Sequence, residues 1–314
     1  MLPRFTPLPS IVVKTEIKSL SSKRDVIFSS NFHFFHDIFK IWAAELIDND
    51  TSLVIGQHGG GPFNRYNAGT KYEIDLADFY LTTGFGNTGY TKLRVLGQYF
   101  TKFKKEAWDK NGKALLVTAN MPRYVFEIRS MPLANQLIKY FNDQLTFYEK
   151  LEANIRSQTI VRLYSPEDND YGWNVSEKWK TLYPNVILES PFKPLSKSAR
   201  NCRLFVSTYN ATTFNEALAA NIPTVIYWDE SLWEAADFAV KDFETLKDVG
   251  IFHETSLSAA QHVNKVWSDL SGWWYRLDVQ DARKNFCYKY ALREKGMERR
   301  LANILKEVTN DVNA

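Results

Sequence analysis

Short apolar runs alternate with amphipathic segments along most of this chain. Cys202–Ser207 and Thr224–Trp228 are apolar runs rich in β-forming residues, and Phe214–Ala220 between them has helical spacing. Two such runs joined through a helix predict a βαβ unit, whose parallel strands are normally buried on both faces. Further runs at Leu53–Gly56 and Thr159–Tyr164 continue the alternation, so the pattern predicts an α/β protein with parallel sheets.

The same pattern predicts how the chain is divided. Three prolines and the lack of a clear period indicate an extended lead-in at the start. The expected parts are a lead-in or linker over residues 1–24, a partial N-terminal Rossmann-like domain over 25–110, a C-terminal Rossmann-like domain over 111–280, and a C-terminal helix over 281–314 that packs across the domains. Within the last part, Val279–Val308 is expected to be one continuous helix.

A polar turn joins the strand Cys202–Ser207 to the helix that follows it. Its hydroxyl and amide side chains are those of Ser207, Thr208, Asn210, Thr212 and Thr213. Ligands of open α/β sheets bind at the carboxyl ends of strands, and a helix N-terminus attracts anions. The turn therefore suits a phosphate group without a glycine loop. Ordinary helix capping is the alternative, but it explains only one or two of these residues.

This stretch also resembles the donor-nucleotide segment of GT-B glycosyltransferases. The resemblance implies that the Ser/Thr-rich turn holds phosphate and that Glu216, on the following helix, contacts the ribose of the donor. The runs QHGGGPFNRYNAGTKYEIDLADFYLTTGFG, RLFVSTYNATTFNEALAANIPTVIYWD and LKDVGIFHETSLSAAQHVNKVWSDLSGWW resemble, more specifically, a family of bacterial transferases of surface-polysaccharide synthesis, which covers O-antigen, capsule and lipopolysaccharide. CDP-glycerol glycerophosphotransferases are more distantly similar.

The resemblance implies a GT-B-like fold, in which two Rossmann-like domains face a cleft. Only one βα unit precedes Gln57, whereas a full acceptor domain should contain several. The N-terminal domain is therefore expected to be short or incomplete. The chain is a reduced version of the fold or part of a longer polypeptide.

A predicted strand runs directly into a glycine-rich loop made of Gln57, His58, Gly59, Gly60 and Gly61. Glycine admits close approach by a ligand and lets N–H groups converge on an anion. An imidazole suits the removal of a proton from an acceptor hydroxyl near neutral pH. The resemblance to glycerophosphotransferases also implies that this loop faces the cleft. His58 is therefore the candidate catalytic base, and the glycine-rich loop is expected to lie on the acceptor side. The alternative is that His58 only bonds to loop backbone.

Arg162 lies in the predicted strand Thr159–Tyr164. A cation inside a strand is costly unless it is paired, and the guanidinium fork suits a diphosphate. Arg162 is therefore a candidate donor-binding residue, and a salt bridge to Asp168 or Asp170 is the alternative.

Three more residues are candidates for contacts with the donor. Tyr171 and Trp173, on the loop after Arg162, are placed to stack on a base or sugar, with core packing as the alternative for Trp173. Asp229 follows a predicted strand, so its carboxylate suits hydroxyls of a sugar or ribose.

Two segments match D-x-D, the metal–diphosphate motif of the other large glycosyltransferase fold. They are Asp48–Asp50 and Asp168–Asp170, and neither follows an apolar strand as that motif requires. Both are expected to be turns. The sequence thus predicts no metal site and no cofactor, since the nucleotide sugar is a substrate.

Composition narrows the class of protein. A net charge of +3 gives no support to a nucleic-acid partner. The two cysteines, Cys202 and Cys287, lie in apolar patterns and are expected to be buried free thiols. No run has the length of a membrane helix, so a cytoplasmic protein is expected, with peripheral contact at the inner face of the membrane as an option. Basic residues from Arg283 to Lys306 are expected to line a solvated helix face, with a membrane-surface patch as the alternative.

The sequence predicts a metal-independent transferase that moves a sugar from a nucleotide-activated donor to a saccharide or lipid-linked saccharide acceptor. The alternatives are a glycerophosphotransferase, a sugar-nucleotide epimerase on the same fold, or a non-catalytic binding or assembly subunit. The short N-terminal half favours the last, with a missing half or partner subunit completing it.

Overall fold

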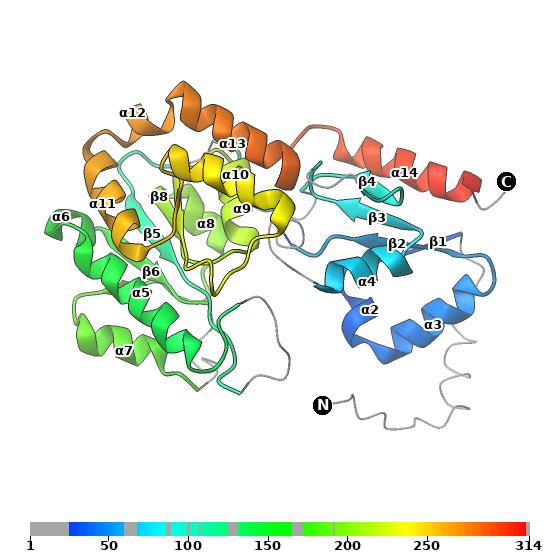
Figure 1. The fold of residues 1–314 in the computed structure, drawn as a ribbon, viewed down its shortest axis with the longest axis horizontal. Helices are drawn as coiled ribbons and strands as arrows, with labels where there is room; N and C mark the ends of the chain where they lie inside the picture. The colour runs from blue at the N-terminus through cyan, green and yellow to red at the C-terminus, as the bar shows by residue number, and fades with distance from the viewer. Residues whose placement is uncertain are drawn as a thin grey trace. The chain divides into compact units, whose positions relative to one another are not determined.

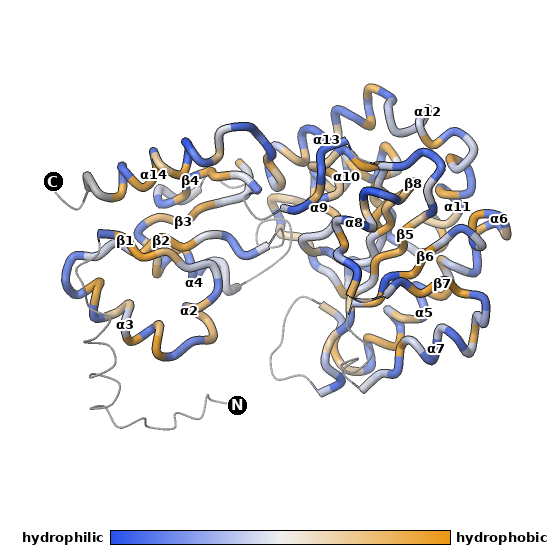
Figure 2. The backbone as a smooth tube through the Cα atoms, turned by 180° about the vertical axis from the view of Figure 1, so that it is seen from behind, coloured by the Kyte–Doolittle hydropathy of each residue, from blue (hydrophilic) through white to orange (hydrophobic). Residues whose placement is uncertain are grey.

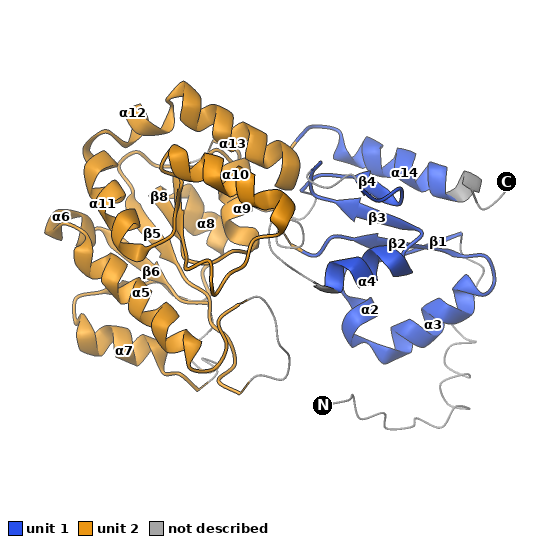
Figure 3. Cartoon of the chain, in the orientation of Figure 1, with its two compact units in different colours: residues 1–58, 68–99, 294–314 blue, residues 59–67, 100–293 orange. Residues whose placement is uncertain are grey.

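In the computed structural model the chain folds into two compact units (Figure 3). Unit 1 contains residues 1–58, 68–99 and 294–314, and unit 2 contains residues 59–67 and 100–293. The structure describes residues 25–59, 68–85, 89–98, 101–106, 108–124, 131–164, 172–190 and 192–311. The expected lead-in over residues 1–24 lies outside the described residues.

Unit 1 is built on a parallel sheet whose strands follow one another in sequence order. The strands are β1 (Val26–Ser29), β2 (Ser52–Gly56), β3 (Phe79–Thr82) and β4 (Leu93–Val95), and the helices between them are α2 (Phe32–Phe35), α3 (Asp37–Ile47) and α4 (Ala68–Leu76). β2 is buried along its whole length, as expected for a parallel strand covered on both faces. Figure 2 shows the hydrophobic stretches that these strands contribute.

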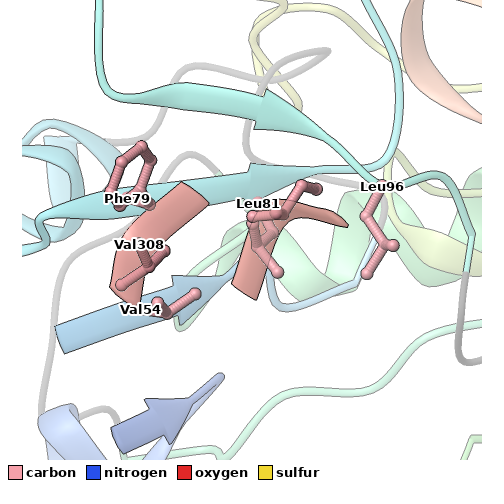
Figure 4. Packing of buried hydrophobic residues seen from close by; sticks show 6 residues of the cluster. Val54, Phe79, Leu81, Leu96 and Val308 are labelled. Atoms are coloured by element: carbon pink, nitrogen blue, oxygen red, sulfur yellow. The ribbon is translucent and has the colours of Figure 1, made fainter. Parts of the chain in front are cut away.

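The C-terminal helix α14 (Met297–Asp311) belongs to unit 1 and packs on this sheet. The buried cluster comprises Val54, Phe79, Leu81, Leu96, Ile304 and Val308 (Figure 4). Arg94 on β4 also pairs with Glu307 of the helix at 2.5 Å. The last helix of the chain therefore closes one face of the first sheet, which needs an apolar cover because parallel sheets are buried on both sides.

The expected single helix over Val279–Val308 is wrong. The chain forms two helices, α13 (Leu277–Tyr290) and α14, with a non-helical segment between them. Gly296 in that segment has a φ of +81°, a left-handed conformation that a continuing helix excludes. Helix α13 belongs to unit 2, and helix α14 belongs to unit 1.

Unit 2 contains a parallel sheet in the order β10-β9-β8-β5-β6-β7. The strands are β5 (Lys113–Val117), β6 (Thr159–Arg162), β7 (Ile187–Leu188), β8 (Cys202–Ser207), β9 (Thr224–Tyr227) and β10 (Phe252–His253). The chain starts in the middle at β5, runs outward to β7, and then crosses to β8 to fill the other half. This is the doubly wound order of a Rossmann-type domain, with its topological switch point between β5 and β8.

Helices cover both faces of this second sheet (Figure 1). Besides α13 they are α5 (Gln136–Lys150), α6 (Ala153–Arg156), α7 (Val175–Leu182), α8 (Leu195–Arg200), α9 (Thr212–Ala219), α10 (Asp237–Asp248), α11 (Ser256–Val266) and α12 (Leu270–Trp274). α5 packs with α11, and α13 packs with both α9 and α10. The predicted α/β architecture with parallel sheets is confirmed. In the described part of the chain, no helix is both long and apolar enough to cross a membrane.

Aromatic rings fill the layer around α9, α10 and α13. Phe214, Trp228, Phe243, Phe252 and Phe286 contact one another, with ring centroids 4.9 to 6.4 Å apart. Such rings bury a large apolar area in fixed geometry. Because Phe214 belongs to the first turn of α9, this packing fixes the helix end that follows β8.

Two half-buried imidazoles predict an acid-sensitive fold. His253 and His262 have ring centroids 5.1 Å apart, and burial lowers the pKa of each to about 4. Their pKa in the unfolded chain is about 6.5, so the unfolded state takes up protons first as the pH falls. Stability is expected to be fully present above pH 6.5 and to be lost toward pH 4, by roughly 3 kcal/mol or more for the interacting pair of rings.

Urea unfolding of the wild type and of His262→Phe between pH 7.5 and pH 5 measures this effect. The variant should lose less free energy of unfolding on acidification than the wild type. His36→Asn is a matched control, because His36 is an exposed helix cap whose role asparagine can fill. Equal pH slopes in the wild type and His262→Phe would contradict the prediction.

Candidate functional site

The carboxyl ends of β6, β5 and β8 lie side by side, with β5 in the middle. Val117, the last residue of β5, is in register with Arg162 of β6 on one side and Ser207 of β8 on the other. Neighbouring strands lie about 4.8 Å apart, so the backbones of Arg162 and Ser207 are roughly 10 Å apart. The structure thus brings the predicted strand arginine and the predicted polar turn to the same edge of one sheet, at the switch point.

Ser207 and Thr208 form the buried base of the turn. The Ser207 hydroxyl donates to the Tyr209 carbonyl at 3.3 Å, and the Thr208 hydroxyl lies 2.6 Å from the Tyr140 hydroxyl. Tyr140 in turn accepts a hydrogen bond from the Ala119 N–H at 2.8 Å. Burial raises the pKa of Tyr140 well above its ordinary value, so this hydroxyl stays protonated. These contacts hold the turn in shape, and Asn210 is likewise fully buried.

Helix α9 begins at Thr212 without a side-chain cap. Ala211, the preceding residue, has an extended backbone, and an alanine offers no capping group. The Thr213 hydroxyl bonds to the Tyr209 hydroxyl at 3.0 Å, while Thr212 is partly exposed. The first N–H groups of a helix have no partner within the helix and carry the positive end of its dipole. The arrangement at this terminus is one that can receive a phosphate.

The glycine-rich loop comes close to this helix. Gly59 lies in unit 2 and has a φ of +71°. A Cβ atom added there would overlap the hydroxyl oxygen of Thr212, so a side chain at position 59 would displace the first residue of α9. Gly60 and Gly61 lie outside the described residues.

Gln57 and His58 follow strand β2 in unit 1. Gln57 is buried, its N–H donates to the Leu81 carbonyl at 2.8 Å, and its side-chain oxygen accepts from the Thr83 N–H at 3.0 Å. Gln57 therefore joins the ends of β2 and β3. His58 is exposed, so its imidazole is available to a ligand in solvent.

Arg162 is paired within the fold. Its guanidinium bonds to Glu189 at 2.6 Å, and that carboxylate also accepts from Lys193 at 2.9 Å and from the Ser198 hydroxyl at 2.6 Å. Burial alone would raise the pKa of Glu189, but the hydrogen bonds from Ser198, Arg162 and Lys193 bring it below its ordinary value. Asp168 and Asp170, the partners considered above, lie outside the described residues. A phosphate at this edge would meet an arginine already oriented by Glu189.

Glu216 points into a polar corner of unit 2. Its carboxylate is hydrogen-bonded by the Thr101 side chain and the Lys102 backbone. Burial raises the pKa of Glu216, and these bonds oppose the shift together with the positive charges of Arg293 and Lys102.

Arg293 is a charged neighbour of Glu216 that the sequence pattern did not identify. It was expected on a solvated helix face, which is wrong because α13 ends at Tyr290 and Arg293 follows in the non-helical segment. Its Nη1 atom is buried and has no hydrogen-bond partner among the described residues. Burial also lowers the pKa of Arg293, while the nearby Glu216 raises it. Arg283 is buried too and donates to the Leu218 carbonyl at 2.9 Å, near the C-terminal end of α9.

Trp173 and Asp229 are held by internal contacts. Trp173 donates its indole N–H to the Met121 carbonyl at 2.9 Å, and the Arg123 guanidinium lies 5.3 Å from its ring centroid. Tyr171 lies outside the described residues. Burial alone would raise the pKa of Asp229, but hydrogen bonds from Lys139 and Ser231 lower it below its ordinary value.

The first D-x-D segment forms a turn at the end of α3. The Asn49 N–H donates to the Leu46 carbonyl at 3.0 Å, and Asp50 has a φ of +64°. The second segment, Asp168–Asp170, lies outside the described residues. Among the residues that the structure describes, no group of three His, Cys, Asp or Glu side chains is placed to hold a metal ion.

The sequence model of the LIC12162 family transferases matches residues 3–305. The chain belongs to the LIC12162 family of transferases. This confirms the resemblance to a transferase family, and the protein is a transferase. No curated protein sequence matches it significantly.

Solved structures show that this LIC12162 family member has the GT-B fold. One is MurG from Acinetobacter baumannii, with a TM-score of 0.50 at 12% identity, covering 95% of this chain and 78% of MurG. A second is a co-structure of S. aureus MnaA with UDP, with a TM-score of 0.55 at 10% identity. The match covers 96% of this chain and 78% of MnaA. A third is an α,α-trehalose 6-phosphate synthase from Burkholderia multivorans, with a TM-score of 0.53 at 10% identity. The match covers 97% of this chain and 74% of the synthase.

Gly59→Ala is expected to lower the free energy of unfolding for two reasons. A left-handed conformation costs a residue with a side chain about 1–2 kcal/mol, and the new Cβ displaces the Thr212 hydroxyl. Urea unfolding should show a smaller loss when Thr212 is already alanine. Gly172→Ala is the matched control, because Gly172 has a φ of +81° but its nearest neighbour would be 3.9 Å away. Identical losses in both Thr212 backgrounds would contradict the close approach.

Proposed function

We propose that this LIC12162 family enzyme transfers a sugar from a nucleotide-sugar donor to a saccharide or lipid-linked saccharide intermediate of a surface polysaccharide, without a metal ion. The observation that carries the proposal is the N-terminus of α9. It lies at the switch point of a doubly wound sheet, lacks a side-chain cap, and begins with a partly exposed threonine.

Positive charge at this edge of the sheet would stabilise a departing nucleotide diphosphate. As the sugar leaves, negative charge develops on the diphosphate oxygens, and preorganised donors stabilise it without reorganisation. The α9 terminus supplies backbone N–H groups, and Arg162 adds a guanidinium that Glu189 already orients. Arg293 is a second cation in the same unit, with one buried nitrogen that has no partner among the described residues. These groups would do the work that a metal ion does elsewhere.

Glu216 is the group that we expect to hold the ribose. A carboxylate offers about four lone-pair directions, and the Thr101 side chain and the Lys102 backbone use two. The others remain for the two hydroxyls of a ribose. The same two bonds fix the orientation of the carboxylate before the donor binds.

His58 is the proposed base. Its ring would take the proton of the acceptor hydroxyl while that oxygen forms the new glycosidic bond and the bond from the sugar to the diphosphate breaks. His58 follows β2 and is exposed, which leaves the imidazole available to an acceptor hydroxyl. Nucleotide sugars are made in the cytoplasm, so we place the reaction there, with peripheral contact at the inner membrane face when the acceptor is lipid-linked.

Thr212→Ala is expected to weaken nucleoside diphosphate binding about ten- to a hundredfold. The reason is the loss of one hydrogen bond to a charged phosphate, which contributes about 1.5–3 kcal/mol. Isothermal titration should be repeated in excess EDTA, where affinity is expected to stay the same. Thr245→Ala is the matched control, an exposed threonine of α10 remote in sequence from the turn. Unchanged affinity in Thr212→Ala, or a tenfold loss in EDTA, would count against the proposed donor site.

His58→Ala is expected to reduce transfer by about 10²–10⁴-fold while donor affinity stays nearly intact, because a base acts on the acceptor hydroxyl. Turnover and nucleotide affinity are to be measured on one preparation, together with the melting temperature. If His58 only supports its loop, the variant will melt at a lower temperature and still turn over once folded. That outcome would remove the catalytic role.

A further inference from the structure

Two positively charged side chains of unit 2 lie over one indole ring that the mechanism above does not use. The Arg123 guanidinium lies 5.3 Å from the Trp173 ring centroid, and the Lys178 ammonium lies 5.7 Å from the Trp173 ring. Arg123 follows β5, the middle strand of the donor edge, and Lys178 belongs to α7. Both cationic residues are exposed, so a ligand in solvent can reach them.

Hydrogen bonds fix the indole and the guanidinium against each other. The Trp173 indole N–H donates to the Met121 carbonyl at 2.9 Å, and the Arg123 guanidinium donates to the Gly172 carbonyl at 3.3 Å. The segment after β5 and the segment before α7 are thereby bonded to each other in both directions. Arg123 uses one of its five N–H donors on this contact, so the others remain for a ligand.

Packing between α5 and α7 fixes the helix that carries Lys178 (Figure 1). The Phe141 ring of α5 lies 6.1 Å from the Trp179 ring of α7, centroid to centroid, and Trp179 is fully buried. The Lys178 ammonium also lies 5.7 Å from the Phe141 ring centroid. Its place over two rings is a cation–π arrangement, which attracts the ammonium group but leaves its charge in place.

Neither cation has a carboxylate partner in the part of the chain that the structure describes. Glu177, next to Lys178 in sequence, pairs with Lys180 at 3.1 Å instead. On the neighbouring strand, by contrast, the Arg162 guanidinium is paired with Glu189. Two like charges held beside one ring repel each other, and a bound anion would offset this repulsion.

The charge and the donors of this cluster select the ligand. Both side chains would repel a cation, and a neutral group would leave their charges unpaired. A carboxylate brings one negative charge, whereas a phosphate monoester carries roughly 1.5 to 2 at neutral pH and offers three acceptor oxygens. A guanidinium fork binds two oxygens of such a group, and an ammonium can bind a third. A phosphate group therefore matches the cluster best.

We propose that Arg123 and Lys178 bind a phosphate group in addition to the one at the N-terminus of α9, and that Trp173 positions both cations. Two substrates can supply it, namely the nucleotide of the donor and the phosphate that joins lipid to saccharide in a lipid-linked acceptor. The choice of these sources rests on the proposed function, whereas the anion site itself does not.

Isothermal titration of the full chain tests both sources. UDP represents the donor, and geranyl phosphate, with geraniol as its uncharged control, represents a lipid-linked acceptor. Arg123→Gln and Lys178→Gln each remove one positive charge and keep a polar side chain. Each is expected to weaken one of the two phosphate probes about three- to tenfold, and less at high salt, where exposed charges are screened. Weaker binding of UDP assigns the site to the donor, and weaker binding of geranyl phosphate assigns it to the acceptor.

Lys180→Gln is the matched control. Lys180 is an exposed lysine of the same helix, but it is paired with Glu177. This variant should leave both affinities unchanged. Lys178→Gln and Lys180→Gln should both melt near the wild-type temperature, since substitutions of exposed side chains change stability little. A loss of affinity in Lys178→Gln alone would then report on phosphate binding and not on folding.

Two results would overturn the proposal. One is that neither Arg123→Gln nor Lys178→Gln weakens the binding of UDP or of geranyl phosphate, and the other is an equal loss in Lys180→Gln, which would reflect general surface charge. Neither result affects the Thr212 test of the donor site. Conversely, UDP affinity that ignores Thr212→Ala, with geranyl phosphate affinity that depends on Lys178, would remove the donor turn and keep this site.

Discussion

The candidate site depends on one constraint, the pairing of β5 on both of its edges. Val117 is held in register with Arg162 on one side and Ser207 on the other, and all three strands are parallel. Because side chains alternate along a strand, a shift of one residue in either pairing would turn the arginine or the serine to the opposite face. The register therefore determines which groups meet at the switch point. Residues 206–210 are buried behind it, Ala211, Thr212 and Thr213 are partly exposed, and Phe214 is buried again.

Buried polar contacts add precision that apolar packing cannot supply. The hydroxyls of Tyr140 and Thr208 join α5 to the end of β8, and the Arg162–Glu189 pair joins β6 to the segment after β7. A buried pair of this kind is a weak source of stability, but breaking it is costly since a charge is left alone. We infer that these contacts fix the geometry of the edge. Arg293, Tyr227 and Trp233, in the same unit, also have buried polar atoms with no partner among the described residues.

The sequence predicted the layered fold better than the partners of individual side chains. The spacing of its apolar residues identified the strand, turn, helix and strand of the central βαβ unit, because this spacing reflects which face of each element is buried. It placed the start of the helix at Phe214, whereas α9 starts at Thr212. Thr212 and Thr213 look like residues of a capping turn, but they belong to the first turn of the helix. The local sequence does not distinguish these two cases.

The sequence pattern could not identify contacts between residues that are far apart in the chain. Glu189 follows Arg162 by 27 positions, and nothing in the spacing marks it as the partner. The helix break before Gly296 was hidden by amphipathic residues on both sides, and so the burial of Arg283 and of the Arg293 Nη1 atom was hidden as well. Lys139, Thr208, Tyr227 and Glu254 line one cavity but come from four separate segments of chain, which only the tertiary fold brings together. The assigned roles of the turn, His58 and Glu216 stay predictions.

The central claim is that the N-terminus of α9 receives the donor diphosphate, and backbone amides report on it most directly. Amide hydrogen exchange of the full chain, resolved by residue, should be measured with and without a saturating nucleoside diphosphate. Our account predicts slower exchange at Thr212–Asn215 and at the end of β5 around Thr118, since bound phosphate oxygens would occupy the N–H groups of the first turn. Binding that slows exchange elsewhere and leaves Thr212–Asn215 unchanged would contradict it.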